Sequence, residues 1–364
     1  MYDVILSFIT AFTLTYFAIP SIINVAKVKN LCDEPGQRTS HSTSVPTLGG
    51  VAIFAGVLFS SIFWTPFTDF GELQYILCSF VIIFLIGVKD DIISISPTKK
   101  FIGQLFAASL LVLKSKISIP SRFGIFGIYD LPYWVSILFS IFVIMVIINS
   151  FNLIDGINGL SASIGIIITV SLGSWFLMID KIEISILAFS LAGALLAFLK
   201  YNYSPAKIFM GDTGSMLIGL ITATLIIEFI EYHHEFPNGQ FSFKSAPAIA
   251  FGILILPLFD TLRVFIIRTR KGRSPFQADR NHIHHMLIDI GLTHMQATGI
   301  LILINIIFII IVATLQDLGN LNVIAITVAL AWSMTSYLFF IYNKKAKPNL
   351  NTKEDKSNLL THQH

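Results

Sequence analysis

The chain has 364 residues, of which 54% are hydrophobic and only 12% are charged. This composition excludes an ordinary water-soluble globular domain, which cannot bury so much apolar sequence. The formal net charge of +3 gives no indication of nucleic-acid binding, and the two cysteines provide neither a disulfide framework nor a cysteine-based zinc site.

Apolar blocks of roughly 17 to 23 residues follow one another along the chain, about the length that an α-helix needs to cross a bilayer. Because lipid offers the backbone no hydrogen-bond partner, we predict an all-α polytopic membrane protein. The first block has no basic start or cleavage site, so we expect a retained span and not a signal peptide. The eleven predicted spans are 4–26, 47–65, 74–88, 101–119, 133–151, 160–178, 184–200, 214–231, 246–266, 297–315 and 321–342.

The basic residues indicate an orientation for these spans, since short loops rich in Lys and Arg stay in the cytoplasm. With the amino terminus outside and the carboxyl terminus cytoplasmic, only five of the 24 basic residues lie on the outer side. These five are Lys114, Lys116, Arg122, Lys181 and Lys244. We predict one transmembrane catalytic domain, residues 1–343, with five cytoplasmic loops, and a disordered basic and polar tail, residues 344–364.

Four aspartates lie at helix ends on the predicted cytoplasmic side. Asp90 and Asp91 end the third span, Asp155 follows the fifth, and Asp212 precedes the eighth. Each alone could be a helix cap or a turn residue. Adjacent carboxylates repel each other unless a cation lies close by, and Mg²⁺ binds such oxygens together with substrate phosphates. Glycines beside Asp155 and Asp212 would also let backbone N–H groups approach a phosphate.

A basic loop after the ninth span ends in three histidines, His282, His284 and His285. A basic loop on this side is first of all an orientation signal. The histidines could bind zinc, although their spacing is not that of a zincin and no thiolate is available. Contacts to substrate phosphates are the favoured interpretation.

Five motifs occur in order on this one side. They are Pro46–Gly50, the Asp90–Asp91 pair, Asn152–Leu160, Tyr201–Asn202 with Phe209–Ser215, and His282–His285. Together they resemble the polyprenyl-phosphate N-acetylhexosamine-1-phosphate transferases of glycosyltransferase family 4. The resemblance implies transfer of a sugar 1-phosphate from a UDP-sugar to undecaprenyl or another polyprenyl phosphate, with release of UMP and with Mg²⁺, or alternatively Mn²⁺, as cofactor.

The same resemblance implies roles for individual residues. Asp212 would bind the metal with Asn152 and Asp91 as co-ligands, and Asp90, paired with Asp91, would be the catalytic carboxylate. The residues expected to contact substrate are Asp155, Asn202 and Phe209 at the nucleotide, and His282, His284 and His285. The chain departs from the common pattern at Asn158, where many relatives have a second aspartate.

The His-x-His-His cluster is similar to that of enzymes using UDP-GlcNAc in lipid-linked glycan synthesis. We therefore favour GlcNAc 1-phosphate transfer, as the first membrane step of cell-envelope glycan synthesis. The alternatives are a phospho-MurNAc-pentapeptide transferase of peptidoglycan synthesis and, from another class, a secondary transporter. The resemblance places the protein in the bacterial cytoplasmic membrane as a multi-pass protein with its site on the cytoplasmic face. Its partners would be a UDP-N-acetylhexosamine, undecaprenyl phosphate, the bilayer and, as an open option, a second copy in a homodimer.

Overall fold

The computed structural model describes residues 1–33, 44–119, 132–272 and 281–361, with side chains up to residue 345. Arg122 and part of the basic loop before the histidines lie outside the described residues. The remaining chain is helical apart from one short antiparallel pair of strands, β1 with β2. The elements are α1 Tyr2–Val28, β1 Cys32–Asp33, β2 Val45–Pro46, α2 Gly49–Trp64, η1 Phe67–Asp69, α3 Leu73–Ile92, α4 Pro97–Lys114, α5 Tyr133–Ile154, α6 Leu160–Met178, α7 Ile182–Asn202, α8 Gly211–Glu235, α9 Ala246–Ile253, α10 Ile255–Arg270, α11 Ile283–Asp289, α12 His294–Thr314, η3 Gln316–Leu318 and α13 Asn320–Thr361.

The helices confirm an all-α polytopic membrane protein. Among the described residues, seven helices are long and apolar enough to span a bilayer, or eight if the bent pair α9 and α10 counts as one span. Helix α2 is apolar but shorter, with 16 residues, and α3 and α4 carry charged residues in a terminal turn. The count of eleven and the orientation stay predictions.

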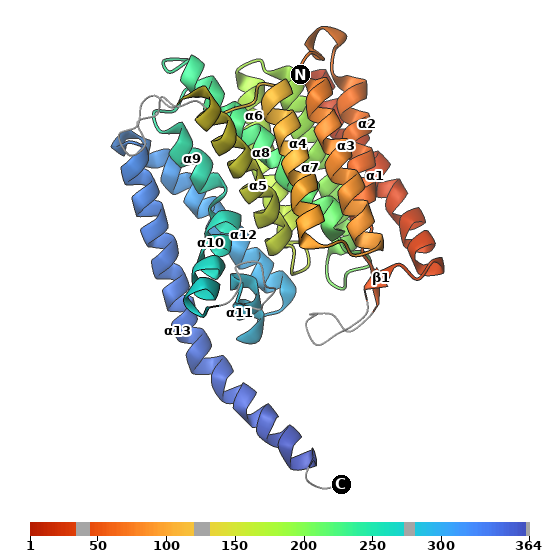
Figure 1. Ribbon diagram of the computed structural model, residues 1–364, viewed down its shortest axis with the longest axis vertical. Coiled ribbons are helices and arrows are strands. Elements are labelled where there is room, and N and C mark those ends of the chain that lie inside the picture. Colours follow the sequence, from red (N-terminus) through yellow and green to blue (C-terminus); the bar gives the residue numbers. More distant parts are fainter. Residues whose placement is uncertain (34–43, 120–131, 273–280, 362–364) are drawn as a thin grey trace.

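Helix α8 is the centre of the bundle, and 94% of its apolar stretch is buried. It packs against α2, α3, α5 and α6, as the crowded middle of Figure 1 shows. Glycines permit this close approach at its first turn: a Cβ on Gly50 would clash with Gly214, and one on Gly87 would clash with Thr213. Small residues allow helix backbones to come together in this way. The beginning of α8 is therefore tightly enclosed.

The predicted span 246–266 is broken, because α9 and α10 meet at 76°. Pro257 has no N–H to donate to the carbonyl of Ile253 four residues earlier, so a continuous helix is interrupted here. The side chain of Asn305 in α12 donates instead to that carbonyl, at 3.4 Å. This bond gives a backbone oxygen freed by the break a partner at membrane depth.

The two ends of the bundle differ. The amino terminus lies at one end, and β1, α11 and the carboxyl terminus lie at the other (Figure 1). The sequence predicts a disordered tail from residue 344, whereas the backbone of α13 continues as a helix to Thr361. The motifs described above gather at the end that carries β1 and α11.

Candidate active site

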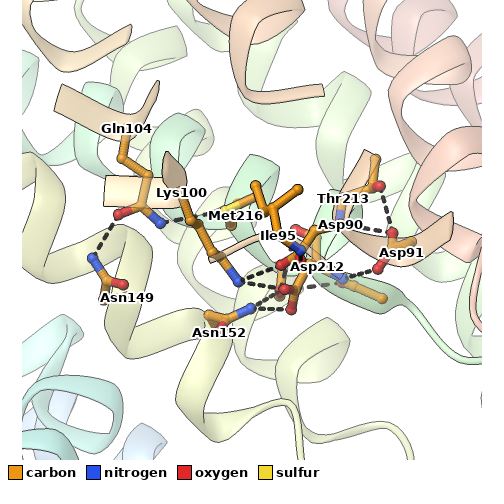
Figure 2. Close-up of polar contacts among 12 residues, drawn as sticks. Asp90, Asp91, Ile95, Lys100, Gln104, Asn149, Asn152, Asp212, Thr213 and Met216 are labelled. Carbon is orange, nitrogen blue, oxygen red and sulfur yellow. Dashed lines mark hydrogen bonds and ion pairs between the residues drawn. The ribbon is translucent and has the colours of Figure 1, made fainter. Parts of the chain in front are cut away.

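Two of the predicted aspartates converge on one lysine. Asp90 lies in the last turn of α3, Asp212 in the first turn of α8, and Lys100 in the first turn of α4. The Lys100 ammonium is 3.2 Å from Asp90 Oδ2 and also forms an ion pair with Asp212 Oδ2 (Figure 2). The pattern of aspartates did not predict this lysine, which shares the predicted cytoplasmic loop 89–100 with Asp90.

The two carboxylates differ in how far they are open to a ligand. The side chain of Asp90 is 12% exposed, and its Oδ1 accepts a 2.7 Å hydrogen bond from the backbone N–H of Ile95 in the turn before α4. The side chain of Asp212 is 32% exposed and that of Lys100 is 17% exposed. Asp212 is thus the more accessible carboxylate, while Asp90 also holds the α3–α4 turn in place.

Asp91 faces a different set of donors. Its carboxylate accepts from the backbone N–H of Asp212 at 2.7 Å, and from the backbone N–H and hydroxyl of Thr213 at 3.1 and 2.5 Å. These donors belong to the first turn of α8, whose N–H groups have no partner within the helix. Asp91 therefore caps α8 and fixes the position of Asp212. This geometry favours a positioning role over the metal or catalytic role expected for Asp91.

Gly211 makes the cap possible. It adopts a φ of +71°, a left-handed conformation that favours glycine. A Cβ at this position would lie 2.6 Å from both carboxylate oxygens of Asp91 and would clash with the carbonyl of Thr47. Glycine is thus required at position 211, where the α8 backbone approaches Asp91.

Asn152 lies beside Asp212, as predicted. Its Nδ2 donates to Asp212 Oδ1 at 2.5 Å and to the Ser215 hydroxyl at 3.0 Å. One turn earlier on α5, Asn149 donates to the side-chain carbonyl of Gln104 at 2.9 Å (Figure 2). These amides link α5 to both α4 and α8. The sequence analysis missed Gln104, for which its position one turn beyond Lys100 was the available signal.

The donors around Lys100 suit Mg²⁺. Asp90 and Asp212 direct hard carboxylate oxygens toward a single cationic group, and the Asn152 amide carries another oxygen of the same kind. Within the described ranges, no three His, Cys, Asp or Glu side chains lie close enough to hold an ion by themselves. Mg²⁺ is usually held by one or two carboxylates together with substrate phosphates and water, which these residues fit.

Asp155 follows α5 directly and is half-buried in the loop before α6. Burial, together with the negative charges of Asp212 and Asp91, raises the pKa of Asp155 to about 7. Asp155 is therefore close enough to the other two aspartates to be influenced by their charges. At neutral pH its carboxyl group is present in both protonation states.

The histidine cluster packs against the same loop. His284 is 2% exposed, and its Nε2 points at Gly156, where a Cβ would clash with it. Burial and the neighbouring His285, whose ring centroid is 4.3 Å away, lower the pKa of His284 to about 3. His284 is consequently a neutral imidazole beside Gly156, the residue that follows Asp155. Its buried Nε2 has no hydrogen-bond partner among the described residues.

Asp260 holds the cluster from α10. Its carboxylate lies 2.8 Å from His282 Nδ1, and it accepts a 3.0 Å hydrogen bond from the backbone N–H of Ile283 at the start of α11. Arg263 contacts both Asp260, at 3.2 Å, and the carbonyl of Asn281. His282 is thus buried in a network with Asp260 and Arg263, and this geometry favours a positioning role over direct contact with a substrate phosphate.

Asn202 is used within the protein. Its Oδ1 accepts from the backbone N–H of Gly159 at 2.7 Å, and its Nδ2 donates to the carbonyl of Ile208 at 2.9 Å. The side chain is 6% exposed. Asn202 therefore ties the Asp155 loop to the segment before α8, and this geometry favours a positioning role over direct contact with a nucleotide.

Phe209 is half-buried at the same end of the bundle. Its backbone N–H donates to the carbonyl of Pro46 at 2.7 Å, and its own carbonyl accepts from the N–H of Gly49 at 2.9 Å. These bonds attach the Pro46–Gly50 motif to the start of α8. All five motifs are thus assembled at one end of the helices.

Known proteins similar to this chain indicate its family. The model of glycosyl transferase family 4 matches residues 73–230, from the start of α3 to near the end of α8. The chain is 32% identical over 321 residues to decaprenyl-phosphate N-acetylglucosaminephosphotransferase of Mycobacterium tuberculosis, covering 81% of this chain and 78% of the relative. It is 30% identical over 280 residues to undecaprenyl-phosphate alpha-N-acetylglucosaminyl 1-phosphate transferase of Escherichia coli K12, covering 75% and 73%. With this site, these helices and these relatives, the chain belongs to the polyprenyl-phosphate N-acetylhexosamine-1-phosphate transferases of glycosyl transferase family 4.

Proposed function

We propose that this protein transfers GlcNAc 1-phosphate from UDP-GlcNAc to a polyprenyl phosphate such as undecaprenyl phosphate, releasing UMP. The observation that carries the proposal is the convergence of Asp90, Asp212 and Lys100 at the ends of three membrane helices. The printed names of the relatives support the acceptor and the sugar, since they specify decaprenyl or undecaprenyl phosphate and N-acetylglucosamine.

The reaction joins two anions. An oxygen of the lipid phosphate forms a bond to the β-phosphorus of UDP-GlcNAc, and the bond from that phosphorus to the bridging oxygen breaks, so that UMP leaves with the electron pair. The main barrier is electrostatic, and fixed positive charge lowers it. Lys100 supplies such a charge at the site.

Asp90, Asp212 and the Asn152 amide oxygen would hold Mg²⁺, with Mn²⁺ as the alternative ion. When bound, the metal supplies Lewis-acid neutralisation of the diphosphate. Asp90 is the carboxylate proposed to act at the lipid phosphate, and Asp91 positions Asp212 by capping α8. The donor set favours Mg²⁺ because carboxylate and amide oxygens are hard ligands.

The nucleotide side of the site is proposed to lie between the Asp155 loop, Phe209 and the histidines. Phe209 offers an aromatic ring for stacking against uracil. His284 presents a neutral imidazole beside Gly156, the residue that follows Asp155, and His285 lies next to His284. Asn202 positions the Asp155 loop through its bond to Gly159, and His282 positions the histidine cluster through its contact with Asp260.

The reacting end of the bundle is proposed to face the cytoplasm, because most of the basic residues lie on that side. UDP-GlcNAc would arrive from the aqueous side, and the acceptor would come from the bilayer with its phosphate at the helix ends. This arrangement would explain why all five motifs are at one end of the helices.

A direct assay tests the proposal. The purified protein in detergent, supplied with UDP-GlcNAc, undecaprenyl phosphate and Mg²⁺, is expected to release UMP and form a lipid-linked GlcNAc diphosphate. UDP-MurNAc-pentapeptide in a parallel reaction is expected to give no product. Release of UMP from the pentapeptide donor alone would refute the sugar assignment, and release from neither donor would refute the transferase.

A further inference from the structure

A second polar site lies at the opposite ends of the same helices. A cavity of about 240 Å³ opens where α3 begins, after Glu72, and where α4 ends, before Ser115. The last turns of α8 line it as well. Along α8, the cavity-lining residues Glu228 and Glu235 lie 16 and 23 residues after Asp212, which corresponds to about 24 and 35 Å at 1.5 Å per residue. Helices α3 and α4 run between these two ends of the bundle (Figure 1).

Carboxyl groups dominate the lining of this cavity, which we call the glutamate cavity. Four glutamates face two lysines across it: Glu72, Glu228, Glu231 and Glu235, with Lys116 and Lys181. Within the described part of the chain, no ion pair joins these glutamates to either lysine, since the ion pairs present there involve other residues. Two of the five basic residues outside the predicted cytoplasmic side are thus placed beside excess carboxylate.

A buried hydroxyl also points to a ligand. Ser115 lines the cavity and is 1% exposed, yet its Oγ has no hydrogen-bond partner among the residues that the structure describes. Because an unpartnered buried polar group is unfavourable, such groups normally have a hydrogen-bond partner. The next residue, Lys116, adopts a φ of 56°, an uncommon conformation for a residue with a Cβ.

The arrangement does not suit a single metal ion. No three acidic or histidine side chains within the described ranges lie close enough to share one ion. The carboxylates are instead spread around a cavity large enough for an elongated organic molecule. Phe176 and Tyr232 contribute aromatic rings to the wall, which can contact an ammonium group or the methylene groups between two of them.

We propose that the glutamate cavity binds primary ammonium groups, as carried by a linear polyamine or by the ethanolamine headgroup of a membrane lipid. The carboxylates would accept hydrogen bonds from the ammonium groups, and the Ser115 hydroxyl would contribute one more polar contact. Because Lys116 and Lys181 would repel the ammonium groups of a ligand, the site would bind molecules whose ammonium groups lie away from the lysines, or molecules that also carry a phosphate for the lysines to contact. A zwitterionic headgroup fits the second description.

The experiment measures binding to the full-length protein. In detergent without lipid, spermidine binding is followed by equilibrium dialysis at fixed ionic strength, with Mg²⁺ and a quaternary amine as competitors. In nanodiscs of phosphatidylcholine, the same measurement is made with and without phosphatidylethanolamine. Saturable spermidine binding that neither competitor removes is expected. A lower apparent affinity in the phosphatidylethanolamine nanodiscs identifies the lipid headgroup as an occupant, and an unchanged affinity identifies the free amine.

Variants locate the site. The double variant Glu228→Gln/Glu231→Gln is expected to weaken spermidine binding at least about tenfold, and Ser115→Ala by about threefold. The matched control is Asp317→Asn, which removes an exposed carboxylate that pairs with Lys244 outside the cavity and should change the affinity less than twofold. Asp212→Ala should abolish UMP release and leave spermidine binding intact.

Three results would overturn the proposal. The first is an absence of saturable binding in both detergent and nanodiscs. The second is an equal loss of affinity in Asp317→Asn and in the double variant, which would indicate a general effect of charge. The third is displacement of spermidine by Mg²⁺ at equal ionic strength. Ser115→Ala carries no charge change and tests the site even if the double variant fails to fold.

Discussion

Replacing Lys100 by methionine tests the central arrangement of the site. The substitution keeps an unbranched side chain, one atom shorter, and removes the ammonium that joins Asp90 to Asp212. At 3.2 Å and an effective dielectric constant of about 20, the attraction between Lys100 and Asp90 is about 5 kcal/mol before desolvation and solvent screening. Since the side chains of Lys100 and Asp90 are partly exposed, we expect Lys100→Met to lower the free energy of unfolding by about 1–3 kcal/mol.

The catalytic effect should be larger than the effect on stability. A fixed charge that acts on a developing anion typically contributes about 10²- to 10³-fold to kcat. We therefore expect Lys100→Met to lower kcat by about that factor. The same variant should need no more Mg²⁺ for half-maximal activity than the parent protein, because the ammonium no longer competes with the metal for the two carboxylates.

The assay is UMP release from UDP-GlcNAc at saturating undecaprenyl phosphate over a range of Mg²⁺ concentrations. Lys99→Met is the matched control, since Lys99 is exposed and removes the same charge from the neighbouring position. Lys100→Arg should retain part of the activity because it keeps the charge. Full activity of Lys100→Met with an unchanged Mg²⁺ dependence would refute the assignment of Lys100 to the site.

Four further substitutions test the roles of individual residues at the site. Asp212→Asn is expected to raise the Mg²⁺ concentration for half-maximal activity more than tenfold, whereas Asp91→Asn should mainly lower the melting temperature; equal Mg²⁺ shifts would contradict the cap. Gly211→Ala should destabilise the protein by at least about 1–2 kcal/mol, because it strains a positive φ and clashes with Thr47, and an unchanged melting temperature would refute this. Asp155→Asn should stabilise the metal-free protein more at pH 8 than at pH 5, by about 2–3 kcal/mol, since each pH unit between 5 and 7 contributes about 1.4 kcal/mol. The parent loses stability as pH rises from the ordinary aspartate pKa toward about 7, so a pH-independent difference would contradict the raised pKa.

Much of the fold was predictable from composition and from the spacing of apolar blocks. Long apolar stretches such as Tyr133–Ile154 leave no alternative to a helix in lipid. The break between α9 and α10 was not predicted, because the interrupting proline lies within a continuous apolar block. Its effect depends on Asn305, some 50 residues later, which provides the replacement hydrogen bond.

For the site, the sequence placed the aspartates at one end but could not distinguish their roles. Asp90 and Asp91 are adjacent in sequence, and only the helical geometry turns one toward Lys100 and the other toward the start of α8. Lys100 was missed because a lysine at a cytoplasmic helix end is an ordinary orientation signal. Asn202 and His282 were grouped with substrate contacts, whereas their hydrogen bonds are to other parts of the protein.

The two halves of the site, the aspartates at the start of α8 and the histidine cluster of α11, differ in how far the neighbouring helices are enclosed by protein. The aspartate half starts on a helix surrounded by neighbours, with 94% of its apolar stretch buried. The histidine half is connected to α12 and α13, whose apolar stretches are only 33% and 11% buried. A transferase must bind a bulky lipid and release a product of similar size in every cycle. We expect the enclosed half to keep the reacting charges in register, and the half beside α12 and α13 to be where such a substrate is accommodated.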